Sequence, residues 1–229
     1  RDYDFVIDGT GASVIINRKT GLGVLRNPST VVFRELQNLA SMPPEVRAFV
    51  SQGDLLSVTK TSAVSSVHRP VHMDSIGIKR YDAKGKVIGQ RIFVGLFTSS
   101  AYNRSVRDIP MLRRKVEKIF NRSSFPPGSH DGKSLLNILE TFPRDELFQA
   151  SEDDLFETSL GILHLQERQR VALFLRRDDF ERFISCQIFV PRDRFSTELR
   201  RQIQNILEDA FAGEMLAFHT QLGSSPLAR

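Results

Sequence analysis

The amino-acid sequence predicts an α+β fold, with mixed or antiparallel sheets and helices packed on one face of a sheet. Three observations predict this class: pairs of apolar strands joined by short turns, helices whose apolar residues recur at helical spacing, and a strand-strand-helix-strand order in the last third of the chain. Short turns join antiparallel strands, whereas a doubly wound parallel sheet needs a crossover between successive strands. We therefore expect small α+β modules and no doubly wound parallel sheet.

The first third of the chain is expected to begin with strands. Residues 3–7, 13–17 and 22–25 are rich in β-forming side chains and are bounded by glycines. A short helix is expected to open at Pro43-Pro44 and to end near Ser51, with a further strand at residues 55–60.

Gly9-Thr10-Gly11 follows the first of these strands and resembles the start of a dinucleotide-binding fingerprint. In that fingerprint the glycines open a helix whose N-terminus holds the pyrophosphate. Here the next residues, Val14 to Asn17, continue as a strand. We therefore interpret the glycines as a hairpin turn.

A clear hairpin is expected next. Residues 73–81 and 86–98 alternate like strands, and Asp82-Ala83-Lys84-Gly85 lies between them. Aspartate at the start and glycine at the close suit a short turn that needs one positive φ angle.

Helices are expected in the middle of the chain. Asp108 is placed to cap a helix with Pro110 in its first turn and with apolar residues at helical spacing. A second helix is expected over residues 132–141. Ser151, followed three residues later by Asp154, resembles a capping box that opens a longer helix reaching about Arg168.

The last third is expected to form a strand-strand-helix-strand module at residues 169–229. Strands at 171–176 and 183–190 precede a helix that starts near Ser196 or Thr197. Residues 214–222 are expected to form another strand, and Gly223-Ser224-Ser225-Pro226 a turn whose second strand lies beyond Arg229, so that this module is truncated. We expect two further units, an incomplete α+β segment at 1–54 and a hairpin-plus-helix unit at 55–168.

Composition narrows the function classes. The net charge is +5, from 32 basic and 27 acidic residues, so nucleic acid is permitted as a partner but not demanded, and the absence of Trp with only 3 Tyr argues against it. The chain contains no apolar run near the roughly 20 residues that cross a bilayer. A single cysteine, Cys186, fits a reducing compartment. Because the chain begins at Arg1 without methionine or leader, we expect a piece of a longer polypeptide.

The residue patterns supply neither a complete catalytic set nor a metal site. Gly128 and Gly132 are separated by three residues where a phosphate loop has four, so we interpret Gly128 to Ser134 as a capped helix start, with anion binding there as the alternative. His68 and His72 are four residues apart, but Pro70 lies between them. Cys186 lies mid-strand and is expected to be a buried thiol without a nucleophilic role.

Four long segments carry a resemblance to a known family. These segments are Val67 to Lys79, Gly95 to Val116, Phe125 to Phe148, and Phe189 to Arg200. In wording and order they resemble the large bacterial NAD-specific glutamate dehydrogenases. The resemblance covers roughly residues 55–212 and is less distinctive before residue 55.

The resemblance implies that the parent enzyme deaminates L-glutamate oxidatively with NAD, in a cytoplasmic homo-oligomer. It implies that this segment belongs to an N-terminal region with ACT-like regulatory modules. Our leading hypothesis is a regulatory and assembly region, in which ACT-like sheets pair across subunits and bind an amino acid effector. None of the family's catalytic residues can be matched here, so the segment is expected to be inactive and to bind neither NAD nor a metal. An alternative is a purely structural assembly module without a ligand.

An effector carboxylate favours guanidinium partners, which donate two parallel hydrogen bonds. Arg104 and Arg107, beside Tyr102 and Asn103, are the first candidates for effector binding. Ser129, His130 and Asp131 are the next. The alternative for all five is surface ion pairing and loop pinning.

Overall fold

The computed structural model describes residues 1–8, 11–27, 29–33, 54–126, 128–222 and 225–229. The chain divides into two compact units, and the division falls within helix α3. The first unit comprises Arg1–Arg114, Pro143–Ala150 and Asp178–Phe183, and the second comprises Lys115–Phe142, Ser151–Arg177 and Ile184–Arg229. Each unit is described by itself below. The helix expected after Pro43-Pro44 lies outside the described residues.

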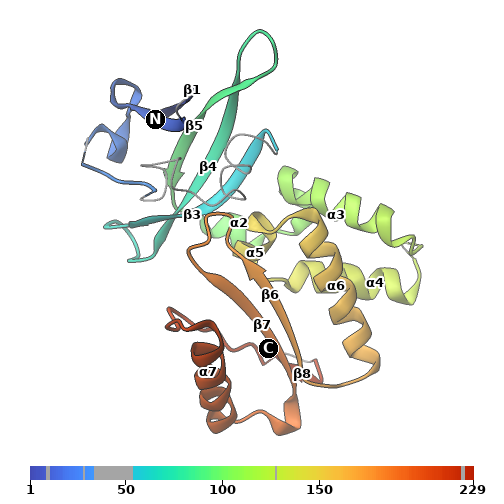
Figure 1. The fold of residues 1–229 in the computed structure, drawn as a ribbon. Coiled ribbons are helices and arrows are strands. Elements are labelled where there is room, and N and C mark those ends of the chain that lie inside the picture. The colour runs from blue at the N-terminus through green and yellow to red at the C-terminus, as the bar shows by residue number, and fades with distance from the viewer. Residues whose placement is uncertain (9–10, 28, 34–53, 127, 223–224) are drawn as a thin grey trace. The chain divides into compact units, whose positions relative to one another are not determined.

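The first unit contains a five-stranded antiparallel sheet (Figure 1). Its strands, in sheet order, are β2 (Gly11–Asn17), β1 (Asp2–Asp8), β5 (Val87–Gly95), β4 (His72–Tyr81) and β3 (Leu56–Val64). Both expected hairpins are confirmed, because β1 pairs with β2 and β4 pairs with β5. In the turn of the second hairpin Gly85 has a φ angle of 78°, as the Asp-to-Gly turn predicts.

The strand expected at residues 22–25 is wrong. This stretch forms a short 3₁₀ helix, η2 (Gly23–Arg26), after another, η1 (Arg18–Thr20). Gly23 has a φ angle of 55°, which lies in the left-handed region and cannot continue a strand. The β-forming side chains Val24 and Leu25 were misleading, because the glycine before them sets the backbone.

One apolar cluster of the first unit lies on one face of the sheet. Tyr3 and Ile92 point from β1 and β5 into a cluster with the side chains Leu25, Val32, Phe33 and Phe180. The rings of Phe33 and Phe180 stack at a centroid distance of 4.9 Å. Residues far apart in sequence therefore share one apolar cluster, whose burial stabilises the unit.

Short helices complete the first unit. They are α2 (Ser99–Asn103), η5 (Val106–Asp108) and α5 (Arg144–Gln149), and α3 (Pro110–Ser123) begins here. Asp108 does not cap α3 as expected. It closes η5, which Ser105 caps by accepting a hydrogen bond from the Arg107 N–H. Pro110 occupies the first position of α3, where its missing N–H costs nothing.

Helices of the second unit pack through apolar stripes. α4 (His130–Thr141) and α6 (Glu152–Glu167) contact each other, with Leu135, Leu139 and Leu155 fully buried. The capping box is confirmed, because the Ser151 hydroxyl accepts a hydrogen bond from the Asp154 N–H at 3.0 Å. The helix it opens ends within a residue of the expected position.

The second unit also holds a three-stranded antiparallel sheet in the order β6 (Ala172–Arg177), β7 (Ile184–Pro191) and β8 (Leu227–Ala228). η6 (Arg192–Arg194) and α7 (Thr197–Phe211) follow β7. The strand expected at 214–222 is wrong, since those residues form neither helix nor strand. The third strand is instead β8, which pairs with Val190 and Pro191. The predicted α+β class with antiparallel sheets is confirmed.

Candidate functional site

The two arginines proposed for effector binding lie on the short segment between α2 and η5. Both side chains are exposed. The backbone around them is held firmly: the Arg104 carbonyl accepts a hydrogen bond from Arg144 Nη2 at 2.9 Å, and the Arg107 N–H donates to Ser105 Oγ at 3.2 Å. The fold therefore fixes the segment while leaving both guanidinium groups accessible to an anion.

Ser129, His130 and Asp131 come together at the start of α4. The Ser129 hydroxyl accepts a hydrogen bond from the Gly132 N–H at 3.0 Å and donates one to the Pro126 carbonyl at 2.7 Å. His130 is 93% exposed, and its Nδ1 lies 3.4 Å from Asp131 Oδ1. The interpretation of this loop as a capped helix start is confirmed, and the Ser129 hydroxyl is already engaged in the cap.

The five candidates divide between the two units. Arg104 and Arg107 lie in the first unit, and Ser129, His130 and Asp131 lie in the second. The structure thus gathers two groups of neighbours, each on one local segment.

A polar network that sequence reasoning missed lies beside Arg104, on the inner side of α2. The Tyr102 hydroxyl donates a hydrogen bond to Asp145 Oδ1 at 2.9 Å. Lys60 Nζ lies 3.2 Å from the same oxygen and 2.6 Å from Asp74 Oδ1. The second Asp74 oxygen accepts the Phe97 N–H at 3.0 Å. The network joins β3, β4, α2 and α5. No local pattern in the sequence predicts these pairs, because their members are 14 to 85 residues apart.

This network has a structural role. Burial raises the pKa of Tyr102, and the negative charge of Asp145 raises it further. The phenol therefore remains a protonated hydrogen-bond donor at neutral pH and cannot serve as a general base. Lys60 is engaged by two carboxylates. The groups satisfy one another and hold two helices on the sheet.

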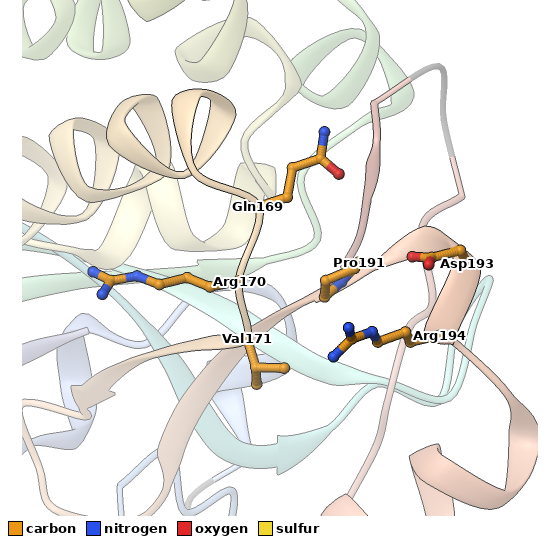
Figure 2. A pocket seen from close by; sticks show the side chains of 6 residues that line it. All are labelled: Gln169, Arg170, Val171, Pro191, Asp193 and Arg194. Carbon is orange, nitrogen blue, oxygen red and sulfur yellow. The ribbon is translucent and has the colours of Figure 1, made fainter.

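A small hollow lies in the second unit between the end of α6 and the end of β7 (Figure 2). It measures about 320 Å³ and is lined by Gln169, Arg170, Val171, Pro191, Asp193 and Arg194. Figure 2 shows the Arg194 side chain running from η6 toward Val171, whereas the Arg170 side chain points away from Pro191, Asp193 and Arg194. The volume is at the lower end for small-molecule sites.

The hollow carries both signs of charge against apolar walls. Arg194 offers a guanidinium group, Asp193 a carboxylate, and Val171 and Pro191 an apolar surface. Pro191 is fixed by its pairing with Leu227 of β8. A lining with both a guanidinium group and a carboxylate suits a zwitterion better than a simple anion.

The glycine-rich segments do not fit a nicotinamide dinucleotide. Asp8 pairs with Gly11 in an antiparallel register, and the chain after Gly11 is β2 and not a helix. At the other segment the hydrogen bond of Ser129 already caps α4. Neither place offers the free helix N-terminus, set directly after a strand, that holds a pyrophosphate.

Metal chemistry receives no support from the part of the chain that the structure describes, where no group of three His, Cys, Asp or Glu side chains is placed to hold an ion. His72, one of the spaced pair, has Nδ1 3.0 Å from the Thr61 carbonyl. Cys186 is partly buried on β7, and burial raises the pKa of its thiol, so it is a poor nucleophile. None of the described helices combines the length and apolar character needed to span a membrane.

Comparison with family models assigns two stretches of the chain. Residues 109–168 match the model described as glutamate dehydrogenase, helical motif 1. Residues 172–229 match the model described as glutamate dehydrogenase, ACT2 domain. The first stretch corresponds to the helices from α3 to α6, and the second to the module of β6, β7, α7 and β8.

Three curated relatives share the same name. A protein of Halomonas elongata named NAD-specific glutamate dehydrogenase is 47% identical over 79% of this chain. Proteins of the same name from Pseudomonas aeruginosa and Mycobacterium tuberculosis are 45% and 34% identical over 100% and 80% of it. The chain spans only 11% to 14% of the length of these relatives.

Proposed function

We propose that this chain is a regulatory and assembly segment of an NAD-specific glutamate dehydrogenase. The premise is that the chain is related to these enzymes and carries their helical motif 1 and ACT2 domain. The parent enzyme would convert L-glutamate, NAD and water into 2-oxoglutarate, ammonia and NADH. The segment itself would be non-catalytic. The enzyme would work as a cytoplasmic homo-oligomer.

The observation that carries this proposal is the ACT2 match over a module that has the expected strand-strand-helix-strand order. A non-catalytic role is supported by the glycine-rich segments, which lack the geometry that holds a dinucleotide. It is also supported by the polar network around Tyr102, whose groups form hydrogen bonds and ion pairs with one another. NAD would then be bound elsewhere in the parent enzyme.

An amino acid is the proposed effector. Arg104 and Arg107 would bind its carboxylate, because both guanidinium groups are exposed on a segment that Ser105 and Arg144 hold in place. Ser129, His130 and Asp131 remain the second group, although the cap leaves mainly His130 and Asp131 to contact a ligand. The hollow at Asp193 and Arg194 is a third place, and the opposite charges in its lining support a zwitterionic ligand.

Isothermal titration of the chain with glutamate, aspartate and other amino acids tests the effector proposal. We expect saturable heat with at least one of them. The double variant Arg104→Ala/Arg107→Ala and the single variants His130→Ala and Arg194→Ala should show which of the three candidate sites binds the amino acid. Only the variant at that site should lose binding. Lys133→Ala, an exposed cation of α4 outside the proposed groups, is the matched control. Absence of heat with every amino acid would leave the assembly role alone.

A purely structural module that holds subunits together without a ligand is the second candidate function. It is favoured by apolar side chains that remain exposed in the second unit, such as Leu173, Leu175 and Ile206. Sedimentation of the chain discriminates, because a module of this kind should associate, and a chain that stays monomeric at all accessible concentrations argues against it.

The remaining proposals concern boundaries and partners. We keep the division into 1–54, 55–168 and 169–229 as a proposed domain organisation. The partners would be other subunits of the same enzyme and the effector, without nucleic acid or membrane. The nearly balanced charge of 32 basic and 27 acidic residues supports the exclusion of nucleic acid.

A further inference from the structure

The sheet of the second unit has one covered face and one open face. On the covered face, Phe174 contacts Phe189 edge-to-face at a centroid distance of 5.8 Å. The same Phe174 ring lies directly against Gly161 of α6, so closely that a Cβ there would stand 2.5 Å from it. α6 therefore covers this face (Figure 1).

The open face is apolar. Because side chains alternate along a strand, Leu173 and Leu175 of β6 point away from Phe174, and their partners on β7 are Ile188 and Cys186. Leu173 and Leu175 are 45% and 49% exposed, and Ile184 farther along β7 is 37% exposed. We call the five residues Leu173, Leu175, Ile184, Cys186 and Ile188 the open face.

Helix α7 carries the complementary surface. Its apolar residues recur at helical spacing and form one stripe, made of Leu199, Ile203, Ile206, Leu207 and Phe211. Among the fifteen residues of α7 none is buried, and Ile206 is 65% exposed. An amphipathic helix gains most of its stability from packing this stripe. In α7 the stripe is only partly covered, because Leu199, Ile203 and Leu207 are half-buried while Ile206 and Phe211 are exposed.

The two surfaces match in size and charge. The fifteen residues of α7 span about 22 Å, and the six residues of β6 span about 20 Å. The open face continues into the exposed Arg177 at the end of β6, and the exposed Asp209 borders the stripe near the end of α7. A helix laid along the strands can therefore bury both apolar surfaces and bring opposite charges together at one end.

We propose that α7 of one copy of this chain packs on the open face of a second copy, and that the second copy returns the same contact. Both surfaces come from one chain, so a closed twofold exchange satisfies four surfaces at once and leaves none exposed. The inference rests on the assembly part of the proposed function and names the surfaces that perform it.

Disulfide trapping tests this exchange, because the sole cysteine of the chain, Cys186, lies on the open face. The variant Ile206→Cys places a second thiol on the stripe of α7, at a position exposed enough to tolerate it. After mild oxidation we expect a band of twice the chain's mass on a non-reducing gel. The control Asn205→Cys places the thiol one residue away on the opposite side of α7 and should give no such band. Adding Leu175→Asp to Ile206→Cys should abolish the cross-link.

Each other outcome overturns the exchange. An intramolecular disulfide in Ile206→Cys means that α7 folds back on its own sheet. Equal cross-linking of Ile206→Cys and Asn205→Cys means unspecific collision. Association in sedimentation without a cross-link in Ile206→Cys retains the assembly role and overturns this interface. A chain that is monomeric in sedimentation overturns both.

Discussion

The Tyr102 hydroxyl donates a hydrogen bond to Asp145 Oδ1 at 2.9 Å, and this contact joins α2 to α5 across 43 residues of sequence. Lys60 contacts the same oxygen from β3. One phenol thus helps to hold two helices, one of them next to Arg104, against the sheet of the first unit.

Tyr102→Phe should remove this hydrogen bond without changing the shape of the side chain. We expect a loss of about 1 kcal/mol in the free energy of unfolding, at the low end for a charged acceptor because Asp145 is partly exposed. Urea denaturation measures it. Tyr81→Phe, at an exposed tyrosine on β4, should change the free energy of unfolding much less, and an equal loss in both variants would contradict the role given to Tyr102.

Alkaline pH should destabilise the wild type more than Tyr102→Phe. The pKa of Tyr102 is raised in the folded chain, chiefly by burial and then by the charge of Asp145. The unfolded chain releases this proton near pH 10, before the folded chain does, so folded stability falls as pH rises above about 10. Denaturation midpoints at pH 8 and pH 10.5 should therefore differ more in the wild type. The same difference in both proteins would rule out this contribution.

Gly161→Ala should destabilise the second unit, although alanine is the better helix former. The new Cβ would stand 2.5 Å from the Phe174 ring, so the ring or α6 must shift. We expect a net cost of about 1–3 kcal/mol, typical of overpacking. Thermal unfolding measures it, with the exposed Glu157→Ala on the same helix as the control. An increase in stability, as propensity alone predicts, would show that α6 does not pack on Phe174.

Asp178→Asn should be among the costliest single changes in the first unit. Asp178 is buried, and its two oxygens accept Arg182 Nε at 2.7 Å and Arg182 Nη2 at 2.9 Å. Leaving Arg182 without its carboxylate partner should cost about 3 kcal/mol. Asp153→Asn removes an exposed partner of Arg122 and should cost less than about 1 kcal/mol. Similar losses in chemical denaturation would contradict the buried character of the first pair.

Local patterns in the sequence were sufficient where neighbouring residues decide the structure. The Asp82–Gly85 turn, the Ser151 capping box and the amphipathic spacing in α7 each depend on residues within a few positions, and the structure has all three. The prediction of a strand at 22–25 was wrong, because Gly23 adopts a positive φ angle despite the β propensity of its neighbours.

Contacts between residues far apart in the chain could not be predicted from the sequence. Nothing near Tyr102 points to Asp145 or Lys60, because that network exists only once β3, α2 and α5 pack together. The third strand of the last module was expected at 214–222, whereas pairing with Val190 and Pro191 selects Ala228 and Leu227. The guanidinium of Arg194 was not singled out, since its position beside Val171 depends on how β7 turns into η6.

Calorimetric titration of the chain with L-glutamate, L-aspartate and NAD, side by side, tests the central claim most directly. A regulatory segment without catalytic chemistry should give saturable heat with an amino acid and none with NAD. Saturable binding of NAD together with no response to any amino acid would contradict the account.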